Sequence, residues 1–261
     1  MLTGHDHFVL TAEINPPELP EMSHLMLGGT WDHVMVTDNV FGKIRVSPYA
    51  HAARITHDVP SVHPTVVVST RDRNILAIES EVRGALGNGV DSFLVVTGDT
   101  VPAVDHLAHH YEIVEHLHEL GERTGAEFEV GMPTRFRQWM LKRRIELGVD
   151  FFVVGPVSDP ATLEPELDRL GWDPSMPPLH LMLLPPFSGM WLNNAEGFGA
   201  VPASQGLRDR LAAVDDKRAF AWDAATEIVH RAEELGLGGA VLTGLKASTV
   251  VGEAAAWAKR L

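Results

Sequence analysis

The stretch Gly89–Asp99, which reads GVDSFLVVTGD, decides the fold of this chain. Residues 92–96 form a short apolar run with two adjacent valines, and such a run is typical of a strand buried on both faces of a parallel sheet. Thr97, Gly98 and Asp99 follow at its C-terminal end, where barrels and doubly wound sheets bind ligands. Gly98 allows close approach of the backbone to a ligand. Asp99 supplies a carboxylate beside it, or it caps the next helix or turn.

Seven further apolar runs recur along the chain, with amphipathic segments between them. The eight predicted strands are Phe8–Ile14, His33–Thr37, Thr65–Ser69, Ser92–Thr97, Glu127–Gly131, Phe151–Val154, Leu179–Leu183 and Ala240–Thr243. The predicted helices include Ile75–Leu86, Val104–Leu120, Phe136–Leu147, Ala161–Leu170, Leu207–Val214 and Ala221–Leu235. This alternation predicts an α/β fold, a (β/α)8 TIM barrel that forms a single domain over residues 1–261. A doubly wound open sheet is the alternative, but no GxGxxG motif follows the first strand.

Composition excludes several classes of function. Hydrophobic residues make up 45% of the 261 residues, which is enough for one large core. Lys and Arg number 21 against 35 Asp and Glu, and the resulting net charge of −14 argues against nucleic-acid and anionic-membrane partners. The absence of cysteine excludes disulfides, thiolate nucleophiles and cysteine metal sites. No signal peptide or membrane-spanning stretch is evident, so we expect a cytoplasmic protein.

Polar side chains follow several of the predicted strands, and in a barrel these strand ends meet at one face. Glu13 ends the first strand just before two prolines, so it is a candidate general acid or base, because burial raises the pKa of a carboxyl group. A helix cap or an ion pair is the alternative. Arg71 and Arg73 follow the third strand, where one arginine could bind a phosphate or carboxylate while the other pairs within the protein. An internal ion-pair network would explain both equally well.

Histidines and aromatic residues give weaker signals. Five histidines lie on one predicted helix, namely His106, His109, His110, His116 and His118. We predict no metal site there, since exposed helical histidines are common and no cysteine or clear carboxylate partner accompanies them. Trp191 and Phe198, after the seventh strand, would either stack on a ligand ring or anchor a loop.

Five short motifs occur in an order and spacing that resemble methylenetetrahydrofolate reductase. They are Glu13-x-x-Pro16-Pro17, VTDN at 36–39 with RVSP at 45–48, His63, TRDRN at 70–74, and TGD at 97–99. The stretch LKRRIELGVDFF at 141–152, and Gly155-Pro156 with Asp159-Pro160, are also similar to that family. The resemblance extends over about residues 8–160.

The resemblance implies a (β/α)8 barrel that holds FAD at the strand C-termini. NADH or NADPH would reduce the flavin, which would pass a hydride to 5,10-methylenetetrahydrofolate and give 5-methyltetrahydrofolate, in one-carbon metabolism and methionine biosynthesis. Glu13 would be the general acid that protonates the folate, and Asp99 the carboxylate beside flavin and pterin. The cofactor-binding residues would be Thr37, Asn39, His63, Arg71, Arg73, Gly98, Asp99, Arg143 and Arg144. The partners would be a tetrahydrofolate derivative and a nicotinamide nucleotide, with a homo-oligomer or a partner subunit also possible.

Two departures from the family pattern weaken the flavin prediction. Gly155 stands where the family has a glutamine that contacts folate or nicotinamide, and the connection Met132–Arg135 is shorter than usual. The alternatives are therefore a folate-binding barrel with a changed role, such as methyltetrahydrofolate oxidation or a subunit of a demethylation pathway with weak or no FAD binding. The non-enzymatic hypothesis is a regulatory or scaffold subunit that has lost the flavin.

Overall fold

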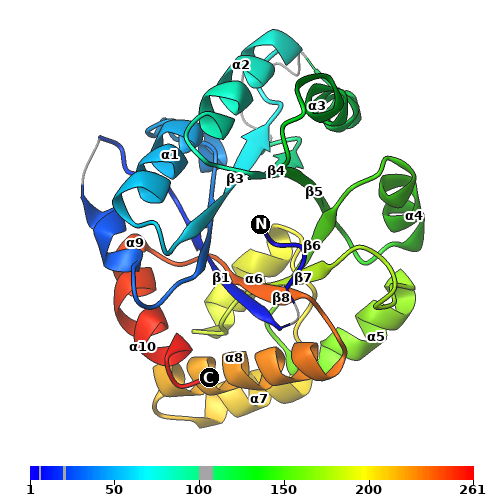
Figure 1. Cartoon of the computed structure of the whole chain (residues 1–261). Helices are drawn as coiled ribbons and strands as arrows, with labels where there is room; N and C mark the ends of the chain where they lie inside the picture. The colour runs from blue at the N-terminus through cyan, green and yellow to red at the C-terminus, as the bar shows by residue number, and fades with distance from the viewer. Residues whose placement is uncertain (6, 20–21, 100–107) are drawn as a thin grey trace.

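Eight parallel strands form a closed barrel in the order of the sequence, with β8 paired to β1 (Figure 1). The computed structural model describes residues 1–5, 7–19, 22–99 and 108–261. The strands are β1 (Val9–Ile14), β2 (His33–Val36), β3 (His63–Ser69), β4 (Ser92–Val96), β5 (Glu129–Thr134), β6 (Phe151–Val157), β7 (Leu179–Leu183) and β8 (Gly239–Leu242). The pairing of the first strand with the last excludes an open sheet and confirms the predicted (β/α)8 barrel.

Alternation along the strands divides the apolar side chains between two cores. Val66 and Val68 of β3 belong to the core between the barrel and its helices, whereas Val67 packs against the barrel interior. That interior contains Met35 and Phe151, both almost fully buried. Because successive side chains of a strand point to opposite faces, a strand that lies between two cores needs a continuous apolar run. This requirement explains the composition of the strand sequences.

Helices surround the barrel, as Figure 1 shows. The longer ones are α1 (Pro48–Asp58), α2 (Ile75–Leu86), α3 (His110–Thr124), α4 (Gln138–Glu146), α5 (Pro160–Leu170), α6 (Gly189–Gly197), α7 (Gln205–Ala213) and α8 (Lys217–Glu234). The short ones are η1 (Ser23–Leu27), η2 (Val40–Gly42), α9 (Ala247–Thr249), η3 (Val250–Ala254) and α10 (Ala255–Ala258). The connection from β7 to β8 is the one that carries the extra helices α6 and α7 before α8.

All eight predicted strands are present, with ends that move by a few residues. The predicted helix Val104–Leu120 lies partly outside the described residues, and its described part belongs to α3. Helices α1 and α6 and the helical segments after β8 were not predicted. No helix in the described parts of the chain is long and apolar enough to cross a membrane.

The N-terminal end of the barrel is closed by the first residues of the chain. Leu2 packs into the barrel interior, and its backbone N–H donates a hydrogen bond to Glu129. The Glu129 carboxylate also accepts from the N–H of Thr3, at 2.9 Å, and from the hydroxyl of Ser92, at 2.6 Å. Glu129 is only 3% exposed, so this carboxylate is buried but fully engaged.

Histidines gather at the same N-terminal end. His33 and His63 begin neighbouring strands and pair in register, with ring centroids 5.4 Å apart. The ring of His5 lies 5.0 Å from that of His33. His180, in β7, is completely buried. These imidazoles therefore belong to the closed end of the barrel.

Candidate active site

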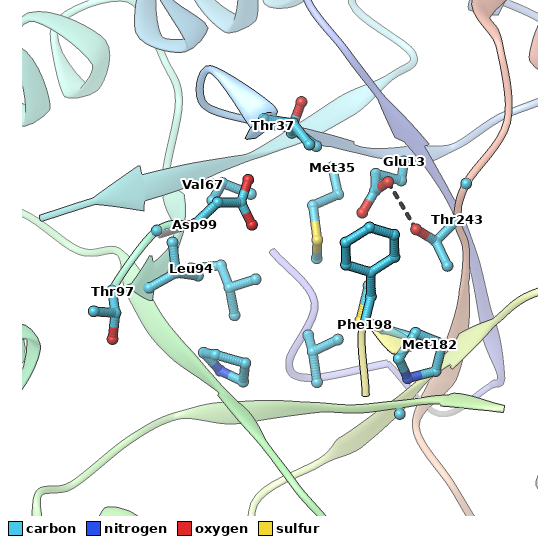
Figure 2. Close-up of a pocket in the computed structure, with 18 of the residues that line it drawn as sticks. Glu13, Met35, Thr37, Val67, Leu94, Thr97, Asp99, Met182, Phe198 and Thr243 are labelled. Atoms are coloured by element: carbon cyan, nitrogen blue, oxygen red, sulfur yellow. Dashed lines mark hydrogen bonds between the residues drawn. The ribbon is translucent and has the colours of Figure 1, made fainter. Parts of the chain in front are cut away.

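A cavity of about 1080 Å³ opens at the C-terminal ends of the strands. Figure 2 shows Glu13 and Asp99 on opposite sides of it, with Met35 between them in the view. Apolar side chains of the strands form its floor, and Phe198, just after helix α6, contributes to its wall. In (β/α)8 barrels this is the end that holds the active site.

Glu13, in β1, is one of three carboxyl groups that line the cavity, together with Asp38 and Asp99. The hydroxyl of Thr243, just after β8, donates a hydrogen bond of 2.7 Å to Glu13 Oε1. Burial raises the pKa of Glu13 above its ordinary value. The hydrogen bonds from Thr243 and the Gly244 backbone lower this pKa, and the charge of Asp99 raises it, but burial is the largest effect. A raised pKa favours a role of this carboxyl group as a general acid or base.

Asp99 lines the same cavity but already has a backbone partner. Its Oδ2 atom accepts a hydrogen bond of 2.6 Å from the N–H of Phe41. The backbone carbonyl of Asp99 accepts a bond of 3.2 Å from Arg71 Nη1. Asp99 is therefore tied to the β2–α1 connection as well as facing the cavity.

Local contacts account for the identity of three residues that line the cavity: Thr37, Gly98 and Gly155. The hydroxyl of Thr37 donates to Asn15 Oδ1 at 2.8 Å. Gly98 has a φ of +86°, and a Cβ there would lie 2.3 Å from Ser69 Oγ, so only glycine fits. Gly155 has a φ of +125°, and a Cβ there would meet the carbonyl oxygen of Met182 at 3.0 Å. The packing thus leaves no room for the glutamine expected at position 155.

Arg71, Arg73 and Asn39 form an internal network. Arg71 is buried, and its Nη2 donates to the carbonyl of Asn39 at 2.8 Å. Arg73 pairs with Asp38, and its Nε lies 3.1 Å from Glu81. The alternative considered for these arginines, an internal ion-pair network, is the one observed for Arg73.

Five of the predicted cofactor residues do not line the cavity, namely Asn39, Arg71 and Arg73 of this network and also His63 and Arg143. His63 begins β3, so it lies at the opposite end of the barrel. Arg143 is exposed on α4 and pairs with Glu146 at 3.3 Å. The neighbouring Arg144, one position further along the helix, does face the cavity.

Arg144 is a buried cation with no carboxylate partner among the residues that the structure describes. It is 6% exposed, and its Nε and Nη1 atoms have no hydrogen-bond partner in the part of the chain that the structure describes. Burial lowers the pKa of Arg144, and the nearby Tyr111 partly offsets this effect. An unpartnered guanidinium beside a cavity favours binding of an anion.

Several cavity residues were not singled out from the sequence. Thr243 and Lys246 follow the last strand, and Arg135, Trp139 and Tyr111 come from β5, α4 and α3. Thr243, Lys246 and Arg135 could have been identified from the sequence because they follow predicted strands. Tyr111 and Trp139 begin helices, where no such signal exists.

The helical histidines do not converge. His106 lies outside the described residues. His109 caps α3, whereas His110 lines the cavity, where burial is the main cause that lowers its pKa to about 4. His116 pairs with Glu79, and His118 lies 3.9 Å from Asp150. Within residues 1–5, 7–19, 22–99 and 108–261, no three His, Asp or Glu side chains are grouped so as to hold a metal ion.

No family model and no curated sequence matches this chain. Solved structures do match. A 2,3-dimethylmalate lyase of the PEP mutase/isocitrate lyase superfamily has a TM-score of 0.56 at 13% identity, covering 98% of this chain and 81% of that one. Oxaloacetate acetylhydrolase has a TM-score of 0.57 at 10% identity, covering 97% and 80%. The native KDPGal structure has a TM-score of 0.51 at 13% identity, covering 98% and 97%. At these identities the likeness shows the fold.

These comparisons contradict the predicted family. The similar structures are a lyase, a hydrolase and an aldolase, so the predictions of a methylenetetrahydrofolate reductase, of an NAD(P)H-dependent oxidoreductase and of a related folate-binding barrel are wrong. The predictions of FAD as cofactor and of NADH or NADPH as co-substrate are therefore also wrong. The motifs have a structural origin instead, since Arg73 pairs with Asp38 and Gly98 packs against Ser69. What the chain shares with its neighbours is the (β/α)8 barrel.

Proposed function

We propose that this protein is an acid–base enzyme of the lyase or aldolase type, which makes or breaks a carbon–carbon bond in a carboxylate substrate. The observation that carries the proposal is Glu13: a carboxyl group with a raised pKa, hydrogen-bonded to Thr243, in the large cavity at the strand ends. Lyases and aldolases need a group that can give and take a proton at carbon near neutral pH.

Glu13 has a defined task in such a reaction. When the carbon–carbon bond breaks, the hydroxyl-bearing carbon becomes a carbonyl and its hydroxyl proton passes to water, while the electron pair of the broken bond passes to the carbon beside the substrate carbonyl and gives an enolate. Protonated Glu13 donates its proton to that carbon and becomes a carboxylate. In the reverse direction the carboxylate removes the same proton. The hydrogen bonds from the Thr243 hydroxyl and the Gly244 backbone stabilise the carboxylate form.

Positive charge in the cavity supports an anionic substrate. Arg144, Arg135 and Lys246 all line it, and the Arg144 guanidinium has no carboxylate partner among the residues described. A carboxylate of the substrate would supply the missing hydrogen bonds. The same cations would stabilise the negative charge that develops on the enolate oxygen.

The names of the similar structures agree with this substrate class. They include a 2,3-dimethylmalate lyase, an oxaloacetate acetylhydrolase, and the carboxyl transferase domain of Rhizobium etli pyruvate carboxylase with pyruvate, which has a TM-score of 0.54 at 13% identity and covers 99% of this chain and 47% of that one. These proteins act on or hold short carboxylates that carry an oxygen substituent. We extend this class, and no individual substrate, to the present chain.

Exchange of substrate protons with solvent tests the proposal without knowledge of the second substrate. Pyruvate and 2-oxobutyrate are incubated with the protein in D2O, and ¹H NMR follows the loss of the protons on the carbon beside the carbonyl. We expect exchange above the buffer rate, and Glu13→Gln should reduce the catalysed rate by about 100-fold or more, because the amide cannot transfer the proton.

Glu115→Gln is the matched control, since Glu115 is an exposed glutamate on α3, away from β1. It should exchange at the wild-type rate. The proposal fails if the wild-type protein catalyses no exchange with either acid. It also fails if Glu13→Gln and Glu115→Gln are equally active.

A further inference from the structure

Phe41 and Phe198 reach across the cavity from two sides and contact each other. Phe41 lies in η2, after β2, and Phe198 follows α6, after β7. Their ring centroids are 5.3 Å apart, and both rings line the cavity. We call this pair the aromatic bridge. The two phenylalanines are more than 150 positions apart in the sequence, so they meet only in the folded protein.

The order of the strands places the aromatic bridge above Glu13. In the closed barrel β8 and β1 lie between β7 and β2. A contact between the connection after β2 and the helix after β7 therefore crosses the ends of β1 and β8, which carry Glu13 and Thr243. Figure 2 shows the ring of Phe198 over this corner of the cavity, next to both residues in the view.

Phe41 adopts a backbone conformation that needs support. Its φ of +54° and ψ of 28° are in the left-handed region, which is an unfavourable conformation for a bulky side chain. Phe41 is also 54% exposed, so burial of the ring does not explain the strain. Another group must hold this backbone in place.

Asp99 is that group. Its Oδ2 accepts the Phe41 N–H at 2.6 Å. Arg71 fixes both sides of this contact, because it donates to the carbonyl of Asn39, two residues before Phe41, and to the carbonyl of Asp99 itself. Asn39 is in turn held by its side-chain oxygen, which accepts the N–H of Arg45 at 2.8 Å.

The geometry points to Asp99 as a positioning residue that acts through Phe41: it holds the aromatic bridge over Glu13, and the bridge forms the apolar wall against which the substrate is bound. This inference rests on the proposed function and deepens it. A wall of two phenylalanines selects carboxylates that carry an apolar substituent beside the reacting carbon. Asp99 then affects substrate binding more than proton transfer.

The test places 4-fluorophenylalanine at position 41 of the full chain and records its ¹⁹F NMR resonance. The ring of Phe198 should displace this resonance from that of the free amino acid, and Phe198→Leu should remove the displacement. Asp99→Ala should also remove it, because Phe41 loses its acceptor. Asp99→Asn should retain it, because the amide oxygen still accepts the Phe41 N–H. Glu115→Ala is the control and should leave the resonance in place.

The exchange assay separates positioning from chemistry. Asp99→Ala should raise the KM for 2-oxobutyrate at least fivefold and change kcat by less than threefold, and Asp99→Asn should restore most of the KM. An unmoved ¹⁹F resonance in Asp99→Ala would overturn the positioning role. A loss of kcat in Asp99→Asn as large as that in Glu13→Gln would overturn it too. If the wild-type protein shows no exchange, the proposed function fails, and the ¹⁹F result still decides whether Asp99 holds Phe41.

Discussion

Two buried charged side chains at opposite ends of the barrel, Glu129 and Arg144, differ in their hydrogen bonding. At the N-terminal end, the Glu129 carboxylate accepts hydrogen bonds from Leu2, Thr3 and Ser92. At the C-terminal end, Arg144 is equally well buried, yet two of its nitrogens lack a partner among the described residues. The same end holds Phe41 in a strained backbone conformation.

This difference separates stability from function. A buried polar group with all its partners stabilises the fold, whereas one without partners costs free energy that a bound ligand can return. Strain also persists where the surrounding structure enforces it, which is common at binding sites. We therefore assign Glu129 to stability and Arg144 to ligand binding, while the imidazole of His180 at the N-terminal end also lacks a hydrogen-bond partner among the described residues. Three predictions test this contrast, from the largest effect to the smallest.

Removal of the Glu129 carboxylate should have the largest effect of any single substitution. Glu129→Ala leaves the backbone N–H groups of Leu2 and Thr3 and the Ser92 hydroxyl without their acceptor, so the free energy of unfolding should fall by about 3 kcal/mol. Urea denaturation measures the change. Glu127→Ala, at an exposed glutamate two residues earlier, should change it by less than about 0.5 kcal/mol. Equal losses in the two variants would contradict a special role for the N-terminal end.

The buried histidines should make the protein sensitive to acid. Burial, the main cause, lowers the pKa of His33 to about 3 and that of His180 to about 4, against about 6.5 when unfolded. The unfolded chain therefore binds protons first as the pH falls. Stability is complete above pH 6.5 and decreases as the pH falls toward the folded-state pKa values, by about 2 kcal/mol for each histidine between pH 7 and pH 5.

Urea denaturation at several pH values measures this dependence. His180→Leu should remove about half of it, since leucine does not titrate. A variant whose stability falls with pH as steeply as that of the wild type would show that His180 stays charged or exposed, against its burial at this end of the barrel.

Removal of the unpartnered cation should have the smallest effect on stability, with the opposite sign. Arg144→Met eliminates a buried charge and should raise the free energy of unfolding by about 1 kcal/mol. The same variant should weaken binding of 2-oxo acids, measured as KM in the exchange assay, by about tenfold. Arg143→Met, at an exposed neighbour, should alter neither quantity appreciably. A loss of stability in Arg144→Met would mean that the guanidinium already has a partner.

The sequence was sufficient for the fold because the signal is local. Each strand must contact two cores, so each is a continuous apolar run, as in residues 92–96. Glu13 was also identified from its position at a strand end. The partner of Glu13 could not be found in this way, because Thr243 lies 230 residues away and the contact exists only when the barrel is closed.

The site was harder to predict because it depends on which way each side chain points from its helix or strand. Arg143 and Arg144 are adjacent, but the helix turns one to solvent and the other to the cavity. His63 precedes its strand, so a parallel barrel places it at the end opposite to the cavity. The order of the short motifs does not show which way a side chain points or at which end of the barrel it lies. The motif order was consistent with a barrel, but the family predicted from the motifs was wrong.

The hydrogen bond between Thr243 and Glu13 also sets the order in which the protein can become active. It joins the first strand to the last, and the loop between them is nearly the whole chain. A folding intermediate with seven strands in place would hold Glu13 without its donor and without the neighbouring wall of β8. Recovery of proton exchange during refolding should therefore follow the docking of the last strand and lag behind the recovery of helical circular dichroism.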